Sequence, residues 1–170
     1  MRKTGFWIPA GLCLAFIAVL AIAQGTRRPG LWESTTSMTF QQSPFPPNIQ
    51  MPPNSPFGGG SHVTQVCVTQ EMIDRYGGPA PQSRGDCQMS NMVKRDNGMT
   101  ADWVCTGQMA GRGNLETTWT EDGHSHTKIH FTGTMQMGPR STPVEWTMDS
   151  TSTYKGADCG SVKPLQMPAR

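Results

Sequence analysis

The stretch NLETTWTEDGHSHTKIHFTGTM, from Asn114 to Met135, predicts a β-hairpin and thereby the class of the fold. It is rich in Thr and also contains Trp, Ile and Phe, residue types that are enriched in strands. Its centre is Asp122-Gly123, a dipeptide typical of the two-residue type I′ turn that joins antiparallel strands. We therefore expect an antiparallel sheet to form around this hairpin.

The flanking segments extend the same pattern. Cys87–Met109 predicts a second hairpin, which turns at Asp96–Gly98. Thr69–Gly78 predicts a short helix that Thr69 caps and Gly77 ends. Further strands are predicted at Gly30–Phe40, His62–Thr69 and Val144–Gly156. About seven strands and one short helix predict an all-β, mainly antiparallel fold. Its architecture is expected to be a curved meander sheet or a partly closed barrel, with a β-sandwich as the alternative.

The amino-terminal residues 1–23 have the pattern of a signal peptide. Arg2 and Lys3 provide a positive start, an apolar run follows, and small residues lead to the expected cleavage site after Ala23. The apolar run is about half as long as the ~20 residues that a membrane-spanning helix needs. We therefore expect residues 24–170 to be a single exported domain, periplasmic or secreted, with no stable membrane span after cleavage.

The charge of the chain argues against nucleic-acid binding. Of the 14 Lys and Arg residues, two lie in the expected signal peptide, so the mature chain balances 12 basic residues against 12 acidic ones. Nucleic-acid binding requires clustered basic residues that neutralise phosphates, and no such cluster is present in the sequence.

Four cysteines lie beyond the expected signal peptide, and an even number in an exported chain predicts two disulfides. Cys87 and Cys105 lie on opposite arms of one predicted hairpin and share a face if its turn has an odd number of residues. That pairing leaves Cys67 to pair with Cys159. A two-residue turn at Asn97-Gly98 would instead place the first pair on opposite faces. A zinc site is the less favoured alternative, because no Cys-x-x-Cys pair is present.

The segment Gln41–Ser61 interrupts the pattern of strands. It contains six prolines and three consecutive glycines, so it cannot form a central strand or the interior of a helix. Its polar, Pro-rich composition predicts a disordered loop. The alternative is a functional loop that recruits a protein partner.

Four short motifs occur in order along the mature chain: RPGLWE (Arg28–Glu33), CVTQE (Cys67–Glu71), GRGN (Gly111–Asn114) and YKGADCG (Tyr154–Gly160). Together with the signal peptide and the length, they resemble a bacterial exported family, domain of unknown function 3617. The resemblance implies bacterial export and transfers no catalytic residues. The GLW opening also resembles the Gly-x-Trp opening of lipocalins, small barrels that hold apolar ligands, and so raises the expectation of a barrel with a cavity.

The heptapeptide HSHTKIH, which begins at His124, places three of the four histidines at alternating positions on one face of a strand. With a two-residue turn, Glu121 faces His124 and Trp119 faces His126 across the hairpin. His124, His126 and Glu121 are therefore a candidate zinc or copper site. Lys128 shares this face and opposes a bound cation, so an exposed polar face is the alternative.

Methionine and tryptophan are the candidate pocket residues. The mature chain holds 11 of the 12 methionines, and Met side chains suit irregular cores, adaptable apolar pockets or, less favoured here, copper sites. Four of the tryptophans fall on predicted strands, where packing in the core is the alternative to lining a pocket. The candidates for a ligand pocket are Trp32, Trp103, Trp119, Trp146, Met135 and Met137.

No catalytic motif is present: the sequence lacks Gly-x-Ser-x-Gly, His-Glu-x-x-His, a phosphate-binding loop and a dinucleotide fingerprint. An enzyme is therefore the less favoured class, and no cofactor is predicted. We expect a periplasmic binding or envelope-associated module, whose partner is an apolar small molecule or an envelope protein. The alternatives are a copper- or zinc-binding protein that uses His and Met, and a protein-interaction module.

Overall fold

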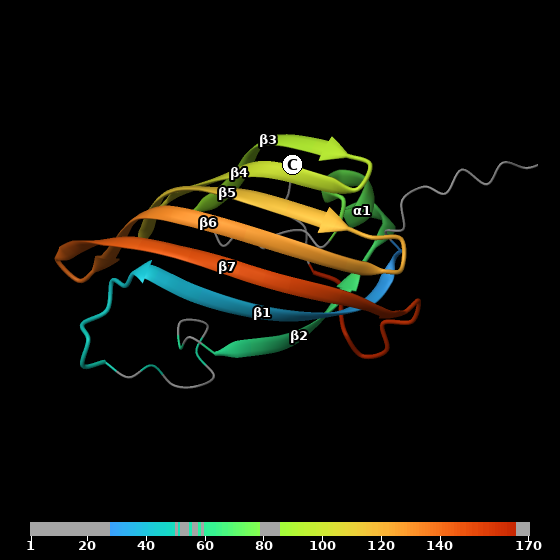
Figure 1. Cartoon of the computed structure of the whole chain (residues 1–170), viewed down its shortest axis with the longest axis horizontal. Coiled ribbons are helices and arrows are strands. Elements are labelled where there is room, and N and C mark those ends of the chain that lie inside the picture. The colour runs from blue at the N-terminus through green and yellow to red at the C-terminus, as the bar shows by residue number, and fades with distance from the viewer. Residues whose placement is uncertain are drawn as a thin grey trace, which may run out of the picture.

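Seven strands form one antiparallel sheet, in the order β2-β1-β7-β6-β5-β4-β3 (Figure 1). The strands are β1 (Gly30–Gln42), β2 (Ser61–Val68), β3 (Cys87–Arg95), β4 (Gly98–Thr106), β5 (Met109–Trp119), β6 (His124–Met137) and β7 (Arg140–Gly156), and the helix is α1 (Gln70–Tyr76). The computed structural model describes residues 28–49, 51, 55, 58, 60–78 and 86–165. The expected signal peptide and its cleavage site after Ala23 lie outside these residues.

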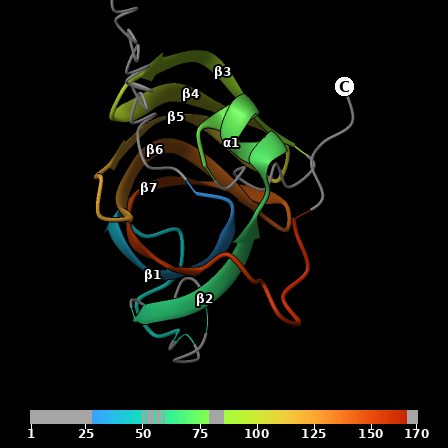
Figure 2. The same cartoon turned by 90° about the vertical axis from the view of Figure 1, so that its right-hand side faces the viewer.

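The sheet curls into an open arc whose two edges are β2 and β3, and α1 occupies part of the open side (Figure 2). This arrangement confirms the prediction of an antiparallel all-β fold with a curved sheet and one short helix. The sheet is not a closed barrel, and the described residues form no second sheet that would make a sandwich. No helix in the described part of the chain is long and apolar enough to cross a bilayer.

The concave face of the sheet carries the hydrophobic core, which has two parts. The larger part is centred on the fully buried Phe131 of β6, whose ring stacks on Trp146 of β7 at a centroid distance of 5.3 Å. The smaller part joins Trp32 and Val68 of the sheet to Met72 of α1. The helix is therefore held to the sheet by apolar burial at one end of the arc.

Two glycines of the GRGN motif make room for the Phe131 ring. Gly111 and Gly113 lie on β5, and a Cβ atom at Gly111 would approach Phe131 Cζ to 2.8 Å and the carbonyl oxygen of Thr132 to 2.4 Å. A Cβ atom at Gly113 would approach the carbonyl oxygen of His130 to 2.5 Å. Any side chain at either position would collide with β6, so glycine is required for this close packing.

The β5–β6 hairpin differs from its prediction by one residue. Trp119 pairs with Ser125, whereas the predicted Asp122-Gly123 turn would have paired it with His126. Four residues, Thr120 to Gly123, lie between the end of β5 and the start of β6. The amide of Gly123 donates to the carbonyl oxygen of Thr120 at 3.3 Å, and Gly123 adopts a φ of 86°. Since successive side chains point to opposite faces, this shift exchanges the faces expected for the residues across the hairpin.

The β3–β4 hairpin contains a bulge that the sequence did not reveal. Arg95 pairs with Gly98, so the turn has two residues, Asp96 and Asn97, and begins one position before the two-residue turn considered at Asn97-Gly98. A turn of this length would by itself keep Cys87 and Cys105 on opposite faces. The register shifts between Ser90 and Val93, and this bulge returns the two cysteines to one face. They pair directly across the strands and form a disulfide.

The second disulfide joins Cys67 of β2 to Cys159, beyond the end of β7. Part of the predicted Gln41–Ser61 loop lies outside the described residues. Of its described part, Gln41 and Gln42 continue β1, and the imidazole Nε2 of His62 lies 2.9 Å from the carbonyl oxygen of Ser55. The expected disorder of this loop stays a prediction.

The ends of α1 match the sequence prediction. The Met72 amide donates to Thr69 Oγ1 at 3.2 Å, and Gly77, with a φ of 77°, donates its amide to the carbonyl oxygen of Ile73 at 2.8 Å. These contacts satisfy backbone groups that a helix of this length leaves unpaired at both ends.

The Thr69→Ala substitution is expected to lower the free energy of unfolding by about 1 kcal/mol, because it removes the capping oxygen. Urea unfolding followed by circular dichroism measures this change. Thr69→Ser keeps the oxygen and serves as the control. An equal loss in both variants would contradict the assignment of the cap.

Candidate functional site

A cavity of about 530 Å³ lies on the concave face of the sheet, next to α1. This volume falls within the range of small-molecule sites in proteins. Its apolar lining comes from the sheet, from α1 and from the segment that follows β7. The apolar lining residues are Trp32, Val66, Val68, Ile73, Tyr76, Met99, Leu115, Trp119, Met148 and Leu165.

Strands β1 and β7 present the same order of side chains to this concave face. Reading along β1 and backwards along β7, the order is an aromatic ring, two hydroxyl-bearing side chains, a methionine and another aromatic ring. The directly opposed pairs are Trp32 with Tyr154, Ser34 with Ser152, Thr36 with Ser150, Met38 with Met148, and Phe40 with Trp146. The hydroxyls of the two strands therefore meet in the middle of the curved face.

Strands β6 and β5 continue the hydroxyl rows. Thr127 lies opposite both Ser150 and Thr117, and Ser125 lies opposite Ser152. We call the seven hydroxyl-bearing residues of these four strands the hydroxyl belt. The hydroxyl belt consists of Ser34, Thr36, Thr117, Ser125, Thr127, Ser150 and Ser152, and all seven line the cavity.

The hydroxyl belt explains why the cavity lies where it does. The next row of the concave face carries larger side chains, with Met148, Ile129 and Leu115 opposite one another on neighbouring strands. Those side chains belong to the packed core or border it, whereas Ser and Thr are too short to fill the same depth. The row of small residues therefore leaves space under α1.

Hydrogen bonds link the belt across the strands. Ser34 and Ser152 place their Oγ atoms 2.6 Å apart, and Thr36 Oγ1 lies 2.8 Å from Ser150 Oγ. Thr117 and Thr127 make the third pair, at 2.9 Å. Each of these hydroxyls thereby has the hydrogen-bond partner that a buried polar group needs, and the bonds fix its orientation.

Trp32, which lines the cavity, is held in place by a ring contact and a hydrogen bond. Trp32 and Tyr154 meet edge to face with centroids 5.4 Å apart, and Trp32 Nε1 donates to the carbonyl oxygen of Arg28 at 2.9 Å. The guanidinium of Arg28 lies 5.9 Å from the centre of the Tyr154 ring. Among the described lining residues, Arg28 is the one that carries a charge, and it is exposed. The interior of the site is therefore neutral.

Two of the six predicted pocket residues line the cavity, and the other four do not. Trp32 and Trp119 line the cavity, whereas Trp146 is buried in the larger core and Trp103 and Met135 pack against that core. Met137 is half-buried at the end of β6 and does not line the cavity. The sequence-based prediction favoured large apolar residues and missed the hydroxyl belt. Ser and Thr occupy the consecutive positions 34–37 of β1 and 150–153 of β7, so no two-residue period marked the hydroxyls that face the cavity.

The histidines of the HSHTKIH segment lie on the opposite, convex face. His126 Nε2 lies 2.9 Å from Asp149 Oδ1, and His130 Nε2 lies 2.9 Å from Glu145 Oε1. Each of these two histidines thus pairs with a carboxylate of β7 and not with another histidine. Glu121 lies in the β5–β6 turn and not opposite His124 in the sheet.

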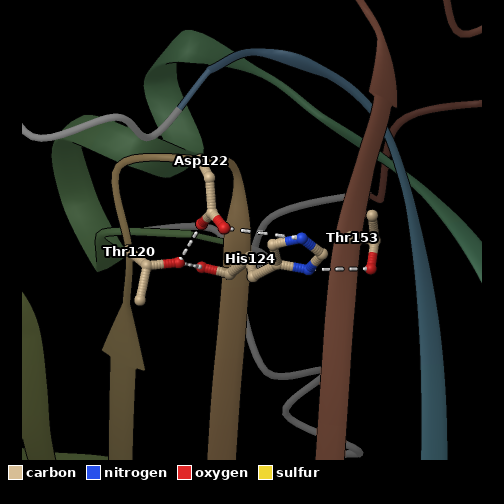
Figure 3. A network of polar contacts seen from close by, with 4 residues as sticks. All are labelled: Thr120, Asp122, His124 and Thr153. Carbon is tan, nitrogen blue, oxygen red and sulfur yellow. Dashed lines mark hydrogen bonds and ion pairs between the residues drawn. The ribbon is translucent and has the colours of Figure 1, made fainter.

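His124 belongs to a separate polar network (Figure 3). Its Nδ1 lies 3.2 Å from Thr153 Oγ1, and its Nε2 lies 3.8 Å from Asp122 Oδ2. The Thr120 hydroxyl donates to the Asp122 carboxylate and holds the pKa of that carboxyl below its usual value. The described residues contain no cluster of three side chains that could hold a metal ion, so the zinc or copper site is not supported.

The Cys67–Cys159 disulfide connects the cavity to the carboxyl-terminal segment. Cys67 precedes the lining residue Val68 and forms a parallel bridge with Pro164, and Leu165 lines the cavity. The bond therefore holds the last described residues against one wall of the site.

Comparison with known proteins gives one match. No curated protein and no solved structure matches the chain. The model of the family described as "Protein of unknown function (DUF3617)" matches residues 27–159, which include every strand and the helix. The chain therefore belongs to the DUF3617 family of proteins of unknown function.

Proposed function

We propose that this protein binds a small, largely apolar organic molecule in the cavity between the sheet and α1. The observation that carries the proposal is the cavity itself, about 530 Å³ in volume, with mainly apolar walls and the hydroxyl belt along one of them. Sites with this volume and with few, converging polar groups are typical of small-molecule binding. The match of the family model adds no ligand, since the family has no known function.

The chemistry of the lining supports binding over catalysis. The described lining residues include no carboxylate, imidazole or thiol, the groups that most often act as general acids, bases or nucleophiles. Six of the seven belt hydroxyls pair with one another, and the described lining residues supply no base to activate any of them. A role as a carrier or a sensor of its ligand fits this lining.

A location in an oxidising compartment outside the cytoplasm would suit the same role. The two disulfides are compatible with such a compartment, and the amino-terminal pattern favours cleavage after Ala23. We propose a periplasmic or secreted location, where the protein would meet apolar molecules in the bacterial envelope.

The Ser150→Phe substitution tests the cavity as the site. Ser150 belongs to the hydroxyl belt, and a phenyl ring at this position would occupy the space above it. We expect the affinity for the neutral fluorophore N-phenylnaphthylamine to fall by about tenfold or more, which corresponds to about 1.4 kcal/mol. Fluorescence titration measures this affinity, and the lining residues Trp32 and Trp119 supply a second signal through quenching.

Thr151→Phe is the matched control, because the next residue of β7 is exposed on the convex face. Circular dichroism and urea unfolding establish that both variants fold. If a folded Ser150→Phe variant bound the fluorophore as tightly as the Thr151→Phe control, the cavity would not be the binding site.

A further inference from the structure

Resting on the proposed binding function, we propose that the ligand is an uncharged acyl ester or amide. Its carbonyl oxygen accepts hydrogen bonds from the hydroxyl belt, while its apolar parts extend to either side. This assigns a ligand class to the site and a recognition role to the seven Ser and Thr residues.

The hydroxyl pairs retain hydrogen-bonding capacity. In a pair such as Thr117 and Thr127, one hydroxyl donates and the other accepts, so the bond between them uses one of their two hydrogens. The pairs Ser34–Ser152 and Thr36–Ser150 have the same property. Three pairs on one wall therefore offer several donors that a carbonyl oxygen in the cavity can use.

A pure hydrocarbon would be a poor match for this wall. It would cover the hydroxyls and remove them from water while returning no hydrogen bond, which costs binding free energy. A carbonyl oxygen replaces the lost water contact. Because a site that is built to hydrogen-bond a polar group discriminates against a ligand that lacks it, the belt favours the oxygen-bearing molecule.

The charges around the cavity favour a neutral group at the belt. No described lining residue near the belt is charged, so an ionised ligand group there would be desolvated without a counter-charge. The guanidinium of Arg28 lies by the Tyr154 ring and is exposed. A carboxylate would therefore be drawn to this outer position and away from the belt.

The position of the belt sets the position of the oxygen within the ligand. Trp32 and Val68 lie on one side of it, and Leu115 and Met148 lie on the other. A ligand that fills the cavity must therefore have apolar groups on both sides of its polar group. An ester or amide within an apolar chain has this arrangement, whereas an alcohol or acid at the end of a chain does not.

The test compares two matched pairs of threonines. Thr117→Val with Thr127→Val removes one hydroxyl pair from the cavity wall. Thr35→Val with Thr151→Val removes two exposed threonines that face each other on the convex side of β1 and β7. Both double variants replace threonine by a side chain of nearly the same shape and with high strand propensity, and urea unfolding establishes that each folds.

The ligands are ethyl decanoate and a linear alkane with the same number of non-hydrogen atoms, each competing with N-phenylnaphthylamine. We expect the cavity variant to lose on the order of fivefold in affinity for the ester, as for one lost hydrogen bond, and none for the alkane. The convex-face variant is expected to leave both affinities unchanged. Comparison of the two ligands between variants cancels their different solubilities in water.

The outcomes separate the two proposals. If the fluorophore binds and the cavity variant binds ester and alkane with unchanged or equally reduced affinities, the ligand class is wrong while the binding function stands. The same conclusion follows if neither competitor displaces the fluorophore, or if the decanoate anion displaces it more strongly than the ester. If the wild-type protein binds none of these molecules, both proposals are wrong.

Discussion

Removal of the Cys67–Cys159 disulfide, by Cys67→Ala with Cys159→Ala, is expected to lower the free energy of unfolding by about 4.6 kcal/mol. The two cysteines are 92 residues apart in the sequence, so the bond closes a loop of about half of the 170-residue chain in the unfolded state. Equilibrium urea unfolding of both proteins measures the difference. The change is a large fraction of the ~5–15 kcal/mol that stabilises a typical domain.

The second disulfide provides the comparison. Cys87 and Cys105 are 18 residues apart, and the same chain-entropy relation predicts a loss of about 3 kcal/mol when both are replaced by alanine. The order of the two losses is the critical result. If the Cys87–Cys105 variant were the less stable of the two, local packing and not loop closure would determine what each bond contributes.

The longer disulfide is also expected to affect binding. It holds the carboxyl-terminal segment against β2, where Leu165 forms part of the cavity wall. Its loss should therefore weaken N-phenylnaphthylamine binding under conditions in which the variant is still folded. The shorter bond joins two residues of the larger core that do not line the cavity.

Phe131→Ala is expected to destabilise the fold by about 3–5 kcal/mol, the usual range for a buried phenylalanine. The Phe131 side chain has no exposed surface and stacks on Trp146 with an interplanar angle of 16°. The ring also covers Gly111 and Gly113, which have no side chains that could fill the vacated space. A cavity would remain, and urea unfolding would detect it as a lower midpoint.

Val93→Ala is the control for this substitution. Val93 lies on the edge strand β3 and is 52% exposed, so its loss should change the free energy of unfolding by no more than about 0.5 kcal/mol. If the Phe131→Ala variant were as stable as Val93→Ala, the Phe131 ring would not be buried in the core of the folded protein.

The strands, the helix and its caps could be predicted from the sequence because they depend on local signals. Thr69 and Gly77 bound α1 through contacts within one turn, and strand-forming residues mark each segment of the sheet. The position of the turn between β5 and β6 was equally clear from the sequence, but the number of residues in the connection was not. Asp122-Gly123 fits a two-residue turn as well as the observed four-residue connection.

This difference of one register position decided which residues form a site. Under the predicted register, His126 faced Trp119; in the structure His126 pairs with Thr118, and Trp119 pairs with Ser125 on the concave face. His126 and His130 are thereby placed on the convex face beside Asp149 and Glu145. Ser125 and Thr127, which lie between the histidines in the sequence, line the cavity instead. Period-two alternation shows that residues share a face without showing which face is buried.

By itself, the sequence determined the class of the fold, the number of strands and the ends of the helix, and its four remaining cysteines predicted two disulfides. Only the tertiary structure decided the registers, through the four-residue connection at Thr120–Gly123 and the bulge between Ser90 and Val93. Those registers bring the hydroxyls of four strands into adjacent rows beneath α1. The physical reason is that Ser and Thr are frequent on both faces of these strands, so only the packing of the large apolar residues around them selects which hydroxyls line a cavity.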